Sequence, residues 1–184
     1  MQPASAYSAS DLTVLKDFMN DGGRIAFMGE HGGYAPAEDA RIAAAVAALG
    51  GSIGINVDAP DGGFHDATVA NGQIFANSLT AGVNTYNYAC FASLALTGTA
   101  QALMVGTDHS QVMMAYQTVG AGSIFLITDQ NVWDHVYAST NDNKEMFENL
   151  LSAYVAPSVP EPGTYALLVA GLGVLGFLAR RRQG

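Results

Sequence analysis

The chain has 184 residues, of which 49% are hydrophobic and 12% charged, and this composition suits one globular domain of about 150 residues plus a tail. Acidic residues outnumber basic ones by 16 to 7, and three of the seven basic residues stand together near the C-terminus. Too few cations remain elsewhere to contact a phosphate backbone, which excludes a nucleic-acid partner. Cys90 is the only cysteine, which excludes an intramolecular disulfide and a thiolate metal cluster. No cofactor is expected.

The first third of the chain predicts alternating helices and strands. A helix is expected over residues 11–20 and a buried strand over 24–28, separated by Gly22-Gly23. A loop rich in Gly and Pro leads to an alanine-rich helix that ends at Leu49, and a further strand follows over 52–57. This alternation is typical of an α/β domain, with a mainly parallel sheet flanked by helices in the manner of flavodoxin.

The beginning of the chain does not fit such a domain. Residues 1–9 carry neither a basic segment nor an apolar segment of an export signal, and we expect them to be a disordered start. The first predicted element is a helix, whereas a doubly wound domain places a strand before it. We therefore expect that a first strand and a signal peptide have been lost upstream of Met1.

The second half is predicted to be richer in strands. Short extended segments are expected around residues 73–75, 88–96 and 102–105. Two longer strands, 111–118 and 123–128, flank Val119-Gly-Ala-Gly122, which indicates a β-hairpin. An amphipathic helix from Asn143 to Tyr154 then closes a domain whose predicted bounds are 10–155.

The order of four segments resembles class I glutamine-amidotransferase-like domains, in particular their non-catalytic relatives in bacterial envelope proteins. These segments are Gly22-Gly23-Arg24, residues 78–83, residues 120–129, and Asp142-Asn143. Enzymatic members carry their nucleophile in a Gly-x-Cys-x-Gly turn, but Ala89 and Phe91 flank Cys90 and no glycine stands on either side. The resemblance therefore implies the fold without amidotransferase activity.

Two polar clusters follow predicted strands. Glu30 and His31 come after the strand at 24–28, and Asp129 and Asp134 come after the strand at 123–128. If these strands are parallel neighbours, the four side chains line one crevice at the carboxyl ends of the sheet, where carboxylates and a histidine can act as acid and base or hold a metal. The alternative is that they cap helices and turn the chain.

The last 25 residues contain three ordered parts. Residues 156–163 form a Pro/Gly linker with Pro160, Glu161 and Pro162. An uncharged apolar run at 164–179 is expected to be a transmembrane helix, and Arg180, Arg181 and Arg182 begin a basic cytoplasmic tail at 180–184. This order resembles the PEP-CTERM sorting signal of exported bacterial proteins. The alternative is a plain C-terminal anchor with a proline-rich hinge.

The PEP-CTERM resemblance implies an exosortase as partner, a membrane protease that recognises the Pro-Glu-Pro motif and cleaves near it. It also implies a single-pass membrane protein of the cell envelope or exopolysaccharide matrix, with its domain outside the cytoplasm and release after cleavage. The leading hypothesis is a non-enzymatic binding or structural domain, with extracellular polysaccharide as a candidate partner. Two alternatives are an exported hydrolase-like enzyme that uses the crevice, and a truncated product without function.

Overall fold

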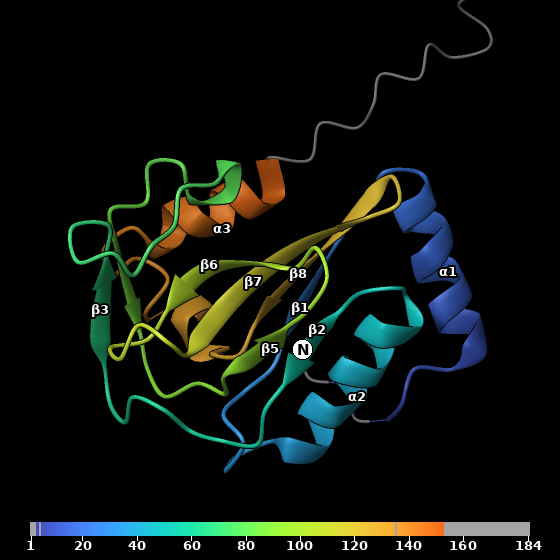
Figure 1. Ribbon diagram of the computed structural model, residues 1–184, viewed down its shortest axis with the longest axis horizontal. Helices are drawn as coiled ribbons and strands as arrows, with labels where there is room; N and C mark the ends of the chain where they lie inside the picture. The colour runs from blue at the N-terminus through green and yellow to red at the C-terminus, as the bar shows by residue number, and fades with distance from the viewer. Residues whose placement is uncertain (1–2, 4, 135, 153–184) are drawn as a thin grey trace, which may run out of the picture. The chain divides into compact units, whose positions relative to one another are not determined.

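A computed structural model describes residues 3, 5–134 and 136–152, which belong to a compact unit, Met1–Tyr154 (Figure 1). A second unit, Val155–Gly184, lies outside the described residues, as do the predicted linker, transmembrane helix and basic tail. The elements in chain order are α1 (Ala9–Asn20), β1 (Arg24–Met28), α2 (Pro36–Ala48), β2 (Ile53–Ile55), β3 (His65–Thr68), the 3₁₀ turn η1 (Ser78–Thr80), β4 (Thr85–Tyr88), β5 (Leu94–Leu96), β6 (Gln101–Val105), β7 (Val112–Val119), β8 (Gly122–Ile127), the 3₁₀ turn η2 (Asn131–Trp133) and α3 (Asn143–Ser152).

The main sheet has six strands in the order β1-β8-β7-β5-β2, and β6 pairs with β7 off this path. Only β1 and β8 run parallel, with Met28 opposite Ile127, and the other strand pairs of this sheet are antiparallel. β3 and β4 form a separate antiparallel pair. The prediction of a mainly parallel, flavodoxin-like sheet is therefore wrong, although the predicted hairpin between the two longest strands is confirmed.

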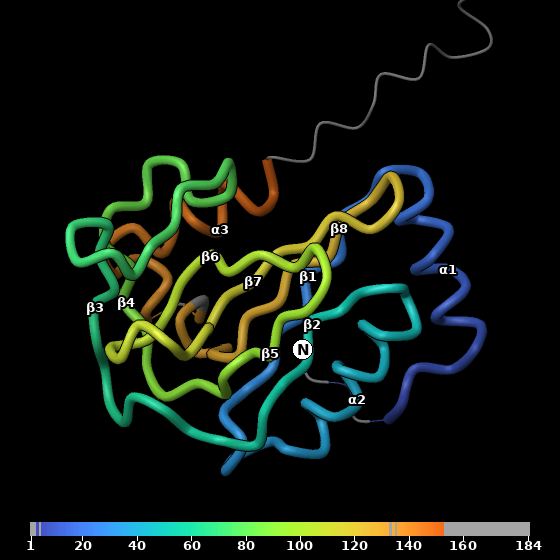
Figure 2. Tube along the Cα trace, in the orientation of Figure 1, coloured from blue at the N-terminus to red at the C-terminus, as the bar shows by residue number. Residues whose placement is uncertain are grey.

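A short connection explains the antiparallel pairing of β7 with β8. A parallel pair needs a crossover of a dozen residues or more, whereas antiparallel neighbours can be joined by a two-residue turn. Gly120 and Ala121 join β7 to β8, and Gly120 has a φ of +60°, which the turn requires and glycine adopts without strain. Figure 2 traces this hairpin to its end beside the C-terminal turn of α1.

Helices and strands cover both faces of the sheet. On one face, α1 and α2 pack against it and enclose buried side chains that include Ile42, Val46 and Leu126. On the other face, α3, the β3–β4 pair and both 3₁₀ turns enclose a second cluster that includes Tyr86 and Met146. All six residues of β8 are buried, because this strand contributes alternate side chains to the two cores.

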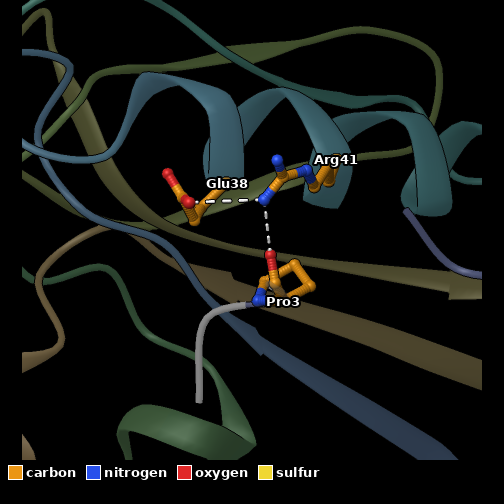
Figure 3. A network of polar contacts seen from close by, with 3 residues as sticks. All are labelled: Pro3, Glu38 and Arg41. Atoms are coloured by element: carbon orange, nitrogen blue, oxygen red, sulfur yellow. Dashed lines mark hydrogen bonds and ion pairs between the residues drawn. The ribbon is translucent and has the colours of Figure 1, made fainter. Parts of the chain in front are cut away.

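The N-terminal segment contacts α1, β1 and α2. Ser8 caps α1 and forms a capping box with Asp11. The ring of Tyr7 meets that of Phe27 edge-on, with 6.1 Å between centroids. Arg41 of α2 donates a 2.8 Å hydrogen bond to the Pro3 carbonyl and pairs with Glu38 at 3.3 Å (Figure 3).

Within the described ranges, no helix has the length and apolarity needed to cross a membrane. α1, for example, has 12 residues and α3 has 10, and one side of each helix is exposed to solvent. The apolar run predicted to span the membrane, residues 164–179, lies in the part of the chain that the structure leaves undescribed.

Candidate functional site

The parallel pair β1–β8 forms a topological switch point, which is where open α/β sheets place their ligands. After Met28 the chain leaves β1 for α2, which packs on one face of the sheet. After Ile127 it leaves β8 for η2 and α3, which pack on the opposite face. Since the two connections diverge from neighbouring strand ends, a crevice is expected between the loops at 29–35 and 128–142.

Two buried carboxylates, those of Glu30 and Asp39, lie at the end of β1. Glu30, the second residue after β1, is only 2% exposed, and its Oε1 accepts a 3.0 Å hydrogen bond from the His31 backbone N–H. Asp39, in the first turns of α2, is 4% exposed, and its Oδ1 accepts a 3.0 Å hydrogen bond from the Glu30 backbone N–H. The Asp39 carboxylate therefore lies across the loop, directly against the end of β1.

Gly29 makes this approach possible. A Cβ atom at position 29 would lie 2.6 Å from Oδ1 of Asp39, which is closer than real Cβ contacts come. The residue before Glu30 is thus required to be small, because the carboxylate of α2 packs onto its backbone.

Asp129 occupies the β8 side and is fully buried. Its Oδ2 accepts a 2.6 Å hydrogen bond from the Ala89 backbone N–H, and its Oδ1 accepts one of 3.2 Å from Asn131. Both carboxylate oxygens therefore hold backbone in place, one in the loop after β4 and the other at the start of η2.

The loop between β2 and β3 is hydrogen-bonded to the loops at the ends of β1 and β4. Figure 2 shows it as a long teal segment that runs from the end of β2 across to β3. Gly32 donates a 2.8 Å hydrogen bond to the Asp58 carbonyl, and the Asp58 side chain accepts one of 2.7 Å from the Ser93 N–H. Phe91 donates to the Pro60 carbonyl at 3.4 Å. Hydrogen bonds thus connect the loops that follow β1, β2 and β4.

The structure brings together three of the four predicted crevice residues, since the charges of Glu30, His31 and Asp129 act on one another. Asp134 has a different place. It is exposed, and its Oδ1 accepts hydrogen bonds from the backbone of Val136 at 2.7 Å and Tyr137 at 3.0 Å. Asp134 therefore turns the loop after η2, as the capping alternative expects.

Sequence reasoning missed two members of this cluster. Asp39 was not among the predicted crevice residues, and nothing in the sequence shows that its carboxylate reaches back to Glu30. Cys90 is half-buried, and the carboxylates that act on its thiol include Glu30 and Asp129. The sequence contains no signal for this contact either, because it depends on how the loop after β4 packs against the end of β8.

Burial sets the electrostatics of the cluster. It raises the pKa of the carboxyls of Glu30, Asp39 and Asp129, in the case of Asp39 from 3.8 to about 6. It also raises the pKa of the Cys90 thiol, and nearby carboxylates add to this effect. A thiol in this setting stays protonated at neutral pH and is a poor nucleophile, in keeping with the absence of flanking glycines.

Two buried polar atoms in the cluster have no hydrogen-bond partner: Oδ2 of Asp39 and Nδ1 of His31. No group of three or more His, Cys, Asp or Glu side chains in the described ranges has a geometry that would hold a metal ion.

The predicted sorting residues, Pro160, Glu161, Pro162 and the three arginines at 180–182, lie outside the described residues. Comparison with protein families identifies them: residues 158–182 match the PEP-CTERM protein-sorting motif. The chain therefore carries a sorting motif that indicates an exported protein. No curated protein matches the chain.

Two solved structures share the fold. One is the mmIFT52 N-terminal domain, with a TM-score of 0.64 and 16% identity over 82% of this chain and 72% of that one. The other is the cytoplasmic protein STM1381 from Salmonella typhimurium LT2, with a TM-score of 0.56 and 12% identity over 77% of this chain and 59% of that one. At these identities the likeness concerns the fold alone. Neither neighbour supports the predicted amidotransferase-like character of the domain.

Proposed function

We propose that this chain is an exported protein of the bacterial envelope, sorted by an exosortase through its C-terminal motif, and that its domain has a non-enzymatic binding or structural role. The match of residues 158–182 to the PEP-CTERM motif is the observation that carries the proposal. In this proposal the apolar run at 164–179 holds the chain in the membrane until cleavage near Pro160-Glu161-Pro162 releases the domain to the cell surface or a polysaccharide matrix.

The buried cluster supports a non-enzymatic role. Both oxygens of Asp129 already accept backbone hydrogen bonds, and Asp39 and Glu30 each hold a backbone N–H of the loop after β1. A general base must reach a substrate proton, whereas these groups are almost fully buried and are used to shape loops.

The alternative, an exported hydrolase-like enzyme, takes its support from the position of Glu30, His31 and Asp129 at the switch point between β1 and β8. It predicts that Glu30→Ala and Asp129→Ala each abolish activity on a polymer or ester substrate while the fold remains. The Cys90 thiol does not support this alternative, because its raised pKa makes it a poor nucleophile.

The sorting proposal is tested with a full-length chain that carries one epitope tag before the domain and another after Gly184, joined to a secretory signal and expressed in a bacterium that has an exosortase. We expect the N-terminal tag in the extracellular or surface fraction and the C-terminal tag separated from it. Replacing both motif prolines, Pro160→Ala with Pro162→Ala, should keep the two tags on one membrane-bound chain.

Pro157→Ala is the matched control, because it removes a neighbouring proline outside the motif. It should be sorted like the wild type. If the double variant is processed and released as efficiently as this control, the motif does not direct sorting and the proposal fails.

A further inference from the structure

A hollow of about 380 Å³ lies where β6 and β7 approach the β7–β8 turn. The described residues that line it are Thr99, Gln101, Tyr116, Thr118 and Gly120. Its volume falls in the range of small-molecule sites, which is about 300–1,000 Å³. Unlike the buried cluster at the ends of β1 and β8, this hollow is open to solvent, because four of its five lining residues are exposed and Tyr116 is half-buried.

The register of the strands places the central side chains of the hollow on one face of the sheet. Tyr116 pairs with Gln101 on β6 and with Phe125 on β8, so β6 and β8 lie along opposite edges of β7 (Figure 1). Thr118 stands two residues after Tyr116 in the same strand and therefore projects from the same face. This is the face that α3 covers, since Tyr116 packs against the core cluster on that side.

The ring of Tyr116 is held in position from the β8 side. The guanidinium of Arg24, on β1, lies over this ring, with 5.8 Å between its central carbon and the ring centroid. Arg24 is itself fixed by a 2.8 Å hydrogen bond that it donates to the Leu150 carbonyl of α3. The Tyr116 hydroxyl lies 3.3 Å from Thr118 Oγ1, and the two groups share one hydrogen bond. A ring that is fixed in this way loses little freedom when a ligand packs against it.

The polar groups around the ring are neutral, and some of them can form further hydrogen bonds. Among the described residues, the side-chain amide of Gln101 has no hydrogen-bond partner, so it offers N–H donors and a carbonyl acceptor. Thr99 Oγ1 accepts a 3.1 Å hydrogen bond from Gln117 Nε2, and its own O–H remains available as a donor. The described lining residues include no lysine, arginine, aspartate or glutamate.

These properties indicate the class of ligand. A sugar ring has an apolar C–H face that can pack on an aromatic ring, and its neighbouring hydroxyls can exchange hydrogen bonds with the Gln101 amide. A charged ligand would find no opposite charge in the lining, and the net charge of −9 disfavours an anion. A peptide strand would need the outer edge of β6, but part of that edge is already occupied, since Phe75 donates to the Leu103 carbonyl.

We propose that the hollow between β6 and the β7–β8 turn binds a neutral pyranose unit of a carbohydrate. The Tyr116 ring is the surface on which the sugar packs, and the Gln101 amide is its main hydrogen-bonding group. The proposal names a ligand class for the proposed binding role of the domain, on which it rests, and it does not depend on how the chain is sorted.

The methyl glycosides of glucose, galactose and mannose are suitable probes, because each keeps a closed and uncharged pyranose ring. The purified full-length chain, in a nonionic detergent that contains no sugar, is titrated with each probe at pH 7. The side-chain amide resonances of Gln101, assigned with Gln101→Ala, are followed by NMR. We expect saturable shifts with at least one of the three probes. The uronic acid derivative of that probe, which differs from it by one carboxylate, should bind more weakly.

Variants locate the site and are compared by saturation-transfer NMR, which observes the sugar. Gln101→Ala changes an exposed side chain, so the fold should remain intact, and binding should weaken by about tenfold. Tyr116→Leu keeps an apolar side chain against the core but removes the ring, and it should also weaken binding by about tenfold. Tyr34→Leu is the matched control, because Tyr34 is 68% exposed and lies outside the hollow, and this variant should bind like the wild type.

The absence of a Gln101 shift with all three probes would overturn the proposal, as would tighter binding of the uronic acid derivative. A Gln101→Ala variant that binds the sugar as well as Tyr34→Leu does would also overturn it, because the sugar would then contact another part of the chain. None of these outcomes bears on tag separation in the sorting experiment, so the two proposals fail separately.

Discussion

Replacing Asp39 by asparagine should change how the stability of the domain depends on pH. The folded state raises the pKa of Asp39 from 3.8 to about 6, mainly because the carboxyl is buried. The folded protein therefore holds this proton more tightly than the unfolded chain does, and the free energy of unfolding falls as the pH rises from about 4 to about 6. At about 1.36 kcal/mol for each pKa unit, this shift corresponds to a loss of about 3 kcal/mol.

Asparagine keeps an oxygen for the Glu30 N–H but does not ionise, so the variant should lose less stability between pH 4 and pH 7 than the wild type. The charge of Asp39 also raises the pKa of Glu30, which strengthens the effect. Urea unfolding of both proteins at pH 4, 5, 6 and 7, followed by circular dichroism, measures the difference. Asp17→Asn, which makes the same chemical change on the exposed face of α1, should retain the wild-type pH dependence. An Asp39→Asn variant with the wild-type slope would refute the burial argument.

Three further predictions concern packing, the loops and the thiol. Gly122→Ala should destabilise the domain by about 1–3 kcal/mol in urea unfolding, because its Cβ would lie 2.4 Å from a backbone carbonyl of α1, whereas Gly62→Ala, which has open space, should be nearly neutral. Asn143→Ala should cost about 2–3 kcal/mol in the same assay, since its amide holds both backbone groups of Asn87 at 2.8 Å. Iodoacetamide should modify Cys90 more slowly at pH 7.5 than it modifies glutathione, and rapid modification would contradict the raised pKa.

Local patterns predicted the elements better than their arrangement. The alternation of α1, β1, α2 and β2 follows from apolar periodicity and from glycine pairs, and the β7–β8 hairpin follows from its Gly-Ala turn. Whether β2 pairs parallel or antiparallel depends on which strand becomes its neighbour. That neighbour is β5, some 40 residues later, and the sequence of β2 contains no signal for this choice.

The candidate site could also be predicted only in part, because local sequence patterns place residues at strand ends but do not show which elements meet there. Glu30, His31 and Asp129 could be placed at strand ends from sequence, and the parallel pairing of β1 with β8 brings those ends together. Asp39 was not predicted as a site residue, because its role depends on the close approach of α2 to Gly29. Asp134 was assigned to the crevice by its nearness to Asp129 in sequence, but the intervening turn η2 directs it to the backbone of the following loop.

The most direct test of the proposed sorting is the intact mass of the protein recovered from outside the cell of an exosortase-bearing host. The account predicts a chain that ends near Pro160-Glu161-Pro162 and lacks the apolar run at 164–179 and the arginines at 180–182. A recovered chain with the mass of the full sequence through Gly184, or a chain found only inside the cell, would contradict it.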